Sequence, residues 1–177
     1  MIGMPDKRRI ALITGASSGL GREFARLLAR EVVDELWLVA RREERLRELA
    51  AEVALPCRVF ALDLTQESAL EALSAALSAE PVTVRWLVNA AGFGRIGMAA
   101  DIGAATTGRM IALNCRAAAE LTERALPYME QGSRVLEIAS CAAFQPIPYL
   151  AAYAATKAFL LRYSRALAAE VAARGCN

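Results

Sequence analysis

The chain has 177 residues and a formal net charge of +2, which is long enough for one domain with a real core and short for two. Apolar residues make up 56% and aromatic residues only 6%, so alanine dominates, which suits helices packed against a sheet. Positive and negative side chains are interspersed, without a basic stripe or an acidic tail, so we expect no nucleic-acid partner. Because no apolar run is long enough to span a bilayer, and the basic start leads into only a short apolar run, we expect no membrane partner.

The sequence contains no histidine and four scattered cysteines, at positions 57, 115, 141 and 176. The lack of histidine argues against a zinc site and excludes a histidine-based catalytic triad. We therefore expect no metal site, and a reduced, cytoplasmic protein whose thiols are mostly small core residues.

Short apolar runs alternate with helical patterns along the chain. In order, strands are predicted at 10–13, 35–40, 58–62, 85–89 and 134–138, and helices at 23–29, 43–52, 66–79, 106–129 and 150–173. Short strands separated by helices predict a parallel sheet with right-handed crossovers. We expect one α/β domain over residues 1–177, a Rossmann-like doubly wound sheet in strand order 3-2-1-4-5 with helices on both faces.

A glycine-rich turn, 14–21, joins the first strand to the first helix. Unpaired N–H groups at the start of a helix, at the positive end of its dipole, attract phosphate. Gly15, Gly19 and Gly21 let a pyrophosphate approach the backbone, and the same turn contains Ser17, Ser18 and Leu20. A loop that merely turns the chain is the alternative, but the strand before it and the helix after it favour a cofactor site.

The end of the second strand predicts which nucleotide binds. Arg41 and Arg42 stand where an NAD-specific fold usually has an acid, and guanidinium groups can bind a 2′-phosphate, so NADP(H) is the expected cofactor. Alternatively, the two arginines simply begin a solvated helix. Asp63 and its neighbour Leu64 follow the third strand, where the adenine would reach. The fourth strand ends in small residues that leave room for a nucleotide, namely Asn89, Ala90, Ala91 and Gly92.

Tyr153 and Lys157 are four residues apart in a helical segment, so their side chains share one face. A neighbouring ammonium favours a phenolate, which makes a tyrosine usable as a general acid or base. Ser140, at the end of the fifth strand, can hydrogen-bond a substrate oxygen. The alternative is a chance pattern in which Tyr153 is an ordinary amphipathic-helix residue. Lys7 and Lys157 are the only lysines in the sequence, which makes the position of Lys157 more informative.

These segments, together with Asn114, resemble the short-chain dehydrogenase/reductase family in order and spacing, from the first strand to the last residue. The resemblance implies an NADP-dependent oxidoreductase that interconverts an alcohol and a carbonyl. It implies that Tyr153 exchanges the proton with the substrate oxygen while the nicotinamide carries the hydride. Lys157 would favour the phenolate and hold the nicotinamide ribose, Ser140 would position the oxygen, and Asn114 would hold a water that links Lys157 to solvent. Without the resemblance, Asn114 is a helix-interior polar residue bonded to backbone.

Two features depart from the family pattern. Ala90 stands where the family often has a second asparagine, and small substitutes are common there. The chain also stops at 174–177, where the family would begin a sixth strand, so the sixth and seventh strands and the segment closing over the nicotinamide are missing. We favour a fragment of a longer reductase over a short form that pairs with another copy.

Two other functions compete with the oxidoreductase. A catalytically silent NADP-binding or interaction module would keep the glycine turn and the arginine pair but do no turnover. A sugar-nucleotide epimerase or dehydratase also uses Tyr-x-x-x-Lys, but its usual glycine spacing differs from 15, 19 and 21.

The chain also predicts something about its partners. Phe93, Phe144, Ile147 and Tyr149 flank the expected site and suggest an apolar or mixed small-molecule carbonyl or alcohol substrate. The alanine-rich helices around 113–125 and 150–167 either only cover the sheet or, as is common in the family, form the face of a homo-oligomer, which we expect.

Overall fold

Five apolar runs of the sequence pair as parallel strands in the order β3-β2-β1-β4-β5, which confirms the predicted topology. The computed structural model describes residues 7–176, so both ends of the predicted 1–177 domain lie outside the described residues. The strands are β1 (Arg8–Thr14), β2 (Glu35–Ala40), β3 (Cys57–Ala61), β4 (Val82–Asn89) and β5 (Arg134–Glu137).

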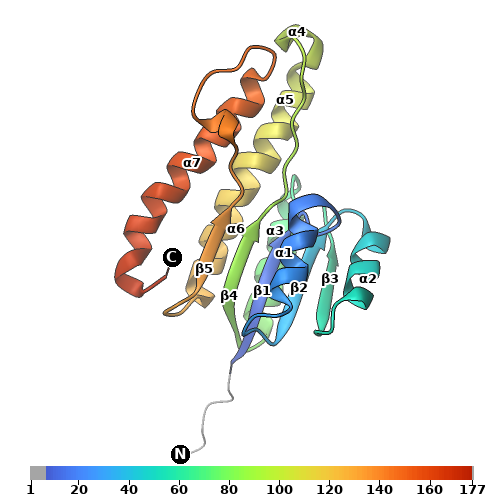
Figure 1. Ribbon diagram of the computed structural model, residues 1–177, viewed down its shortest axis with the longest axis vertical. Coiled ribbons are helices and arrows are strands. Elements are labelled where there is room, and N and C mark those ends of the chain that lie inside the picture. Colours follow the sequence, from blue (N-terminus) through green and yellow to red (C-terminus); the bar gives the residue numbers. More distant parts are fainter. Residues whose placement is uncertain (1–6, 177) are drawn as a thin grey trace, which may run out of the picture.

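Helices cover both faces of this sheet (Figure 1). One face is covered by α1 (Gly19–Leu28) and α2 (Glu43–Glu52). The other is covered by α3 (Glu67–Ala79), α6 (Ala118–Ala125) and α7 (Ala151–Val171). The remaining helical segments are α4 (Ala99–Ile102), α5 (Ala104–Ile111), the π-helix η1 (Ala112–Ala117) and the 3₁₀ turns η2 (Leu126–Tyr128), η3 (Cys141–Ala143) and η4 (Ala172–Arg174).

The alternation of side chains along β1 shows why two separate cores form. Ile10 and Leu12 pack on the side of α3, α6 and α7, whereas Ala11 and Ile13 pack on the side of α1 and α2. All four are 0% exposed, as expected for a central strand whose side chains alternate between two covered faces.

The predicted single helix over 106–129 is wrong in detail. The helix begins at Ala104, after the short α4, and its middle is the π-helical turn η1 between α5 and α6. A π turn accommodates extra backbone within one turn and is frequent at functional sites. Asn114 lies in η1, and its side chain is hydrogen-bonded to two other segments, so the irregular turn coincides with a point where three parts of the chain meet. Pro127 lies in the 3₁₀ turn η2 that ends the helix.

Other predicted bounds differ by a few residues. The first helix begins at Gly19 rather than at Glu23, because the end of the glycine-rich turn forms its first turn. Strand β4 begins at Val82 rather than at Arg85. Within residues 7–176, none of the helices combines the length and the apolar character that crossing a membrane requires.

Candidate functional site

The glycine-rich turn after β1 lies directly against the segment that follows β4. The Thr14 hydroxyl accepts a hydrogen bond from the Ala91 N–H at 3.0 Å. A Cβ on Gly15 would lie 2.8 Å from the Ala91 nitrogen and 2.9 Å from the Ala90 carbonyl oxygen, so no side chain fits there. The carboxyl ends of β1 and β4 therefore bring two predicted parts of the cofactor site together, at the sheet edge above which the chain runs on to α4 (Figure 1).

The geometry of this turn fits a diphosphate. Gly15 and Gly19 have φ angles of 68° and 56°, a region that favours glycine. A Cβ on Gly21 would lie 2.5 Å from the Gly15 carbonyl oxygen, so the helix starts in direct contact with the turn. In the described part of the chain, the Ser18 side chain makes no capping hydrogen bond to the first turn of α1. The peptide N–H groups in the first turn of α1 can therefore bind an anion.

An arginine side chain reaches into the same turn. The Arg42 guanidinium donates hydrogen bonds to the hydroxyls of Ser17 at 3.0 Å and Ser18 at 2.8 Å. Arg42 is exposed, so its charge is available beside the turn, and the neighbouring Arg41 is exposed as well. The predicted arginine pair therefore lies at the glycine cradle, with Arg42 in direct contact with it.

Asp63 and Leu64 follow β3, and Asp63 is near enough to Arg41 to feel its charge. The Asp63 carboxylate accepts hydrogen bonds from the Thr65 N–H at 3.0 Å and the Thr65 hydroxyl at 2.8 Å. Burial raises the pKa of Asp63, but these bonds and the charge of Arg41 outweigh it, and the net shift is downward. Asp63 is therefore an anion that organises the turn before α3, while Leu64 is 4% exposed and belongs to the core.

Tyr153 and Lys157 lie on one face of α7, as their spacing predicted. The Lys157 ammonium is 5.8 Å from the centre of the Tyr153 ring and donates a hydrogen bond of 2.6 Å to the Ile138 carbonyl, just after β5. Lys157 is 6% exposed. Burial lowers the pKa of Lys157, and the charge of Glu137 and the thiol of Cys115 oppose that shift. The lysine is thus held rigidly beside the tyrosine in a largely water-free position.

Asn114 ties three parts of the site together. Its side-chain oxygen accepts from the Phe93 N–H at 3.0 Å, and its amide donates to the Phe93 carbonyl at 2.9 Å and the Thr156 hydroxyl at 3.0 Å. A Cβ on Gly92 would lie 3.0 Å from the Asn114 side-chain oxygen and 3.5 Å from the Lys157 nitrogen. Asn114 and Lys157 therefore meet at Gly92, beside the end of β4.

Ser140 lies three residues after the last residue of β5, Glu137, and begins the 3₁₀ turn η3. Its hydroxyl accepts a hydrogen bond from the Ala142 N–H at 3.2 Å. The hydroxyl donates only a long contact of 4.0 Å to the Cys141 sulfur, a weak acceptor that a substrate oxygen can replace. The turn packs against α7, the helix that carries Tyr153 and Lys157.

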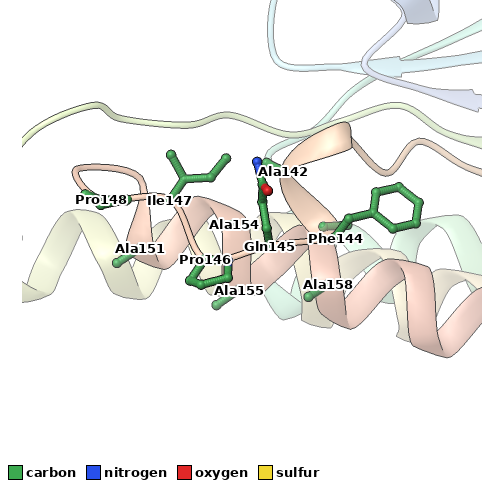
Figure 2. A pocket seen from close by; sticks show the side chains of 11 residues that line it. Ala142, Phe144, Gln145, Pro146, Ile147, Pro148, Ala151, Ala154, Ala155 and Ala158 are labelled. Atoms are coloured by element: carbon green, nitrogen blue, oxygen red, sulfur yellow. The ribbon is translucent and has the colours of Figure 1, made fainter.

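The four predicted substrate residues do not gather in one place. Phe93 lies on the Asn114 side of the site, whereas Phe144 and Ile147 line an apolar cavity of about 590 Å³. Figure 2 shows this cavity between the 142–148 loop and the alanine-rich side of α7, and neither Tyr153 nor Lys157 lines it. Phe144 and Ile147 therefore lie on the Ser140 side, because Ala142, whose N–H binds the Ser140 hydroxyl, lines the same cavity. That all four residues flank the expected site stays a prediction.

Tyr149 closes the 142–149 loop in a strained conformation. Its φ angle of 64° is unusual for a residue with a side chain. Its carbonyl accepts a hydrogen bond of 2.9 Å from the Gly97 N–H, which joins this loop to the segment after β4. The two loops that border the site are thereby fixed to each other.

Three contacting residues were missed by the sequence argument. Thr14 binds the Ala91 peptide, and its position directly before the first glycine was the signal that could have indicated this contact. A Cβ on Gly94 would lie 2.7 Å from the Tyr153 ring, so this glycine lies against the ring. Glu137 accepts hydrogen bonds from Asn89 and Thr122, both at 2.8 Å. The signal for Glu137 was an acid at the end of an apolar strand.

Comparisons with known proteins agree with this geometry. The family model described as short chain dehydrogenase matches residues 9–177. An uncharacterised oxidoreductase of Staphylococcus epidermidis is 29% identical over 171 residues, which cover 96% of this chain and 74% of the relative.

Two solved structures show what similar chains bind. A short-chain dehydrogenase from Sphingobium yanoikuyae in complex with NADPH has a TM-score of 0.86 and 33% identity, covering 96% of this chain and 68% of that one. A 3-ketoacyl-(acyl-carrier-protein) reductase from Brucella melitensis, complexed with NADH, has a TM-score of 0.85 and 30% identity, covering 97% and 73%.

Proposed function

The chain belongs to the short-chain dehydrogenase family, and on that premise we propose that it is an NADP-dependent oxidoreductase that interconverts an alcohol and a carbonyl group. The observation that carries this proposal is the convergence of Asn114 and Lys157 at Gly92, with Tyr153 beside the lysine. That cluster adjoins the glycine cradle, because the segment after β4 contacts both.

The cradle suits a dinucleotide, since side chains are excluded at Gly15 and Gly21 and the first N–H groups of α1 have no side-chain cap from Ser18. We assign the adenosine 2′-phosphate to Arg41 and Arg42, and the adenine to the side of Asp63 and Leu64. Arg42 is already held by Ser17 and Ser18, so little ordering is needed when it binds a phosphate. Exposed Leu20 would border the cofactor, and Asn89, Ala90, Ala91 and Gly92 would lie along it. The bound nicotinamide would supply or accept a hydride.

Tyr153 is the group that exchanges a proton with the substrate oxygen. The Lys157 ammonium stabilises the negative charge that Tyr153 acquires when it gives up its proton. Ser140 donates its hydroxyl hydrogen to the same substrate oxygen and so orients it. Asn114 holds the Phe93 peptide and, beside Lys157, is placed to hold a water that passes protons to solvent.

Turnover tests the reaction directly. We expect Tyr153→Phe to lower carbonyl-dependent NADPH oxidation about 10²- to 10⁴-fold, the usual contribution of general acid–base catalysis, while NADPH still binds. The matched control is Tyr163→Phe on the same helix, whose hydroxyl donates to the Ala119 carbonyl and whose loss should leave turnover nearly unchanged. Binding of NADPH without turnover of any carbonyl by the parent protein would favour the silent binding module instead.

Cofactor preference tests the arginine assignment. Titration of NADPH and NADH should show tighter NADPH binding, and Arg42→Ala and Arg41→Ala should each weaken NADPH about tenfold or more while leaving NADH little changed. Arg45→Ala removes an exposed positive charge from the first turn of α2, the helix that follows Arg42, and should leave both affinities nearly unchanged. Equal affinities of the parent for the two cofactors would overturn the assignment of the 2′-phosphate.

The remaining expectations extend this proposal. A carbonyl or alcohol of apolar or mixed character suits the exposed Tyr149 and the half-buried Phe93 beside the site. The four cysteines are free thiols, which supports a reducing, cytoplasmic location. A homo-oligomer through the helices around 113–125 and 150–167 is supported by exposed apolar residues such as Ile111 and Phe159, which lie beside and within these helices.

A further inference from the structure

We propose that Glu137 is a positioning residue of the active site: its carboxylate, fixed at the end of β5, keeps the Lys157 ammonium charged and in place. This inference rests on the proposed function only for its catalytic consequence. The pairing itself concerns two side chains of this chain and can be measured without cofactor or substrate.

The carboxylate is fixed on one side only. Its Oε1 accepts hydrogen bonds from the Asn89 amide and the Thr122 hydroxyl, both at 2.8 Å. Its Oε2 is buried and has no hydrogen-bond partner among the described residues. A buried carboxylate oxygen that no donor reaches is costly unless an opposite charge lies nearby.

Lys157 supplies that positive charge, because its ammonium is held at the residue next to Glu137. Its ammonium donates to the carbonyl of Ile138, the residue that directly follows Glu137. Burial raises the pKa of Glu137, and the hydrogen bonds from Asn89 and Thr122 and the charge of Lys157 only partly oppose that rise. Burial lowers the pKa of Lys157, and Glu137 is the first of the two groups that oppose that fall. Among the described residues the two side chains share no hydrogen bond or ion pair within 4.0 Å, so the attraction between them acts at longer range.

Three other titratable side chains face this pair: Tyr153, whose ring is 5.8 Å from the ammonium, Cys115 and Tyr163. Cys115, in η1, faces Lys157, and burial raises the pKa of its thiol. Tyr163, on α7, faces Glu137, and burial raises the pKa of its hydroxyl, with Glu123 and Glu170 adding to the effect. Glu137 is therefore the acidic side chain, among the described residues, whose charge supports the ammonium.

The pair has a functional consequence. Because the lysine is desolvated, it would lose its proton more readily if Glu137 were neutral. A neutral amine cannot stabilise the negative charge on Tyr153. Removing the charge of Glu137 should therefore bring the alkaline loss of activity to a lower pH.

The sequence offers a direct measurement, because Lys7 and Lys157 are the only lysines. Protein labelled with ¹³Cε-lysine in a Lys7→Arg background gives a single lysine signal, whose pH titration reports the charge of Lys157. In this background, Glu137→Gln removes the charge and keeps an acceptor for Asn89 and Thr122. Thr122→Val is the matched control, because it removes a neighbouring hydrogen bond and keeps the charge.

We expect the titration midpoint of Lys157 to move to lower pH in Glu137→Gln and to stay at the parental value in Thr122→Val. An unchanged midpoint in folded Glu137→Gln would overturn the proposal. If that variant does not fold, the parent decides: the lysine signal should show a second, smaller step where Glu137 titrates, above the usual carboxyl range, and a single step would overturn the pairing. A shifted midpoint in a protein without turnover would instead contradict only the proposed function.

Discussion

Gly94 lies flat against the Tyr153 ring, and this contact predicts an effect on turnover. A Cβ at position 94 would lie 2.7 Å from the ring, closer than atoms pack. The ring or the 92–94 backbone must therefore move in Gly94→Ala. Because a misplacement of about 1 Å can cost up to about 10²-fold in rate, we expect kcat to fall about 10- to 100-fold.

The same variant should weaken NADPH binding less than it lowers kcat, because the contact of Gly94 is with Tyr153 and not with Gly15 or Gly21 of the cradle. Gly108→Ala is the control: it lies in α5 with nothing within 4 Å of the added Cβ, and it should stabilise the fold by about 0.5–1 kcal/mol without affecting kcat. Steady-state kinetics and NADPH titration measure both effects. A kcat for Gly94→Ala equal to that of the parent would show that Tyr153 does not depend on this contact.

Individual residues show where prediction from sequence ends. The shared face of Tyr153 and Lys157 follows from helix periodicity, and the cradle at Gly15 and Gly21 follows from a local turn, so both could be predicted. The contact of Gly94 with Tyr153 joins the loop after β4 to α7, two segments that are far apart in the sequence. No local pattern encodes that contact, and the same holds for Glu137 and Lys157.

The helical element α5–η1–α6 depends on Asn114, which is 0% exposed. Asn114→Ala removes one acceptor and one donor from the Phe93 peptide and a donor from the Thr156 hydroxyl. A buried polar group left without its partner costs about 1–3 kcal/mol, so we expect a loss of at least about 2 kcal/mol in the free energy of unfolding. Urea denaturation measures this, and turnover should fall as well.

Arg109→Ala is the control for that element, because Arg109 is exposed on α5 and its removal should change stability by no more than about 0.5 kcal/mol. A stability of Asn114→Ala within that range would mean that the Phe93 peptide finds other partners, which contradicts a structural role for the asparagine.

At the scale of elements, prediction from sequence succeeds where packing is regular. The short apolar runs and amphipathic helices gave the parallel sheet and its order, and α2 has the predicted bounds, with Leu46 and Leu49 buried. The π turn could not be predicted, because the residues that Asn114 bonds there belong to a distant loop and to α7, which no local pattern indicates. The apolar pattern of 106–129 is continuous through it.

Over the whole molecule, both faces of the sheet are covered, whereas α7 carries an exposed apolar side chain on its outer side. Both faces of the sheet have buried cores. On α7, however, Phe159 is 42% exposed and stacks on Tyr163 at 5.8 Å between ring centres. Within residues 7–176, β5 pairs with β4 on one side only. Exposed apolar groups on a long helix mark a place where a second copy can pack.

The proposed homo-oligomer can be tested on that helix. Phe159→Glu places a charge where we expect an apolar contact, so the dissociation constant measured by sedimentation should rise about tenfold or more. Leu27→Glu is the matched control, since Leu27 is an exposed apolar residue on α1, which covers the other face of the sheet. If both variants associate as the parent does, the interface does not include Phe159. A parent that sediments as a monomer at every concentration would rule out the homo-oligomer. Phe159 would then face solvent in the isolated chain.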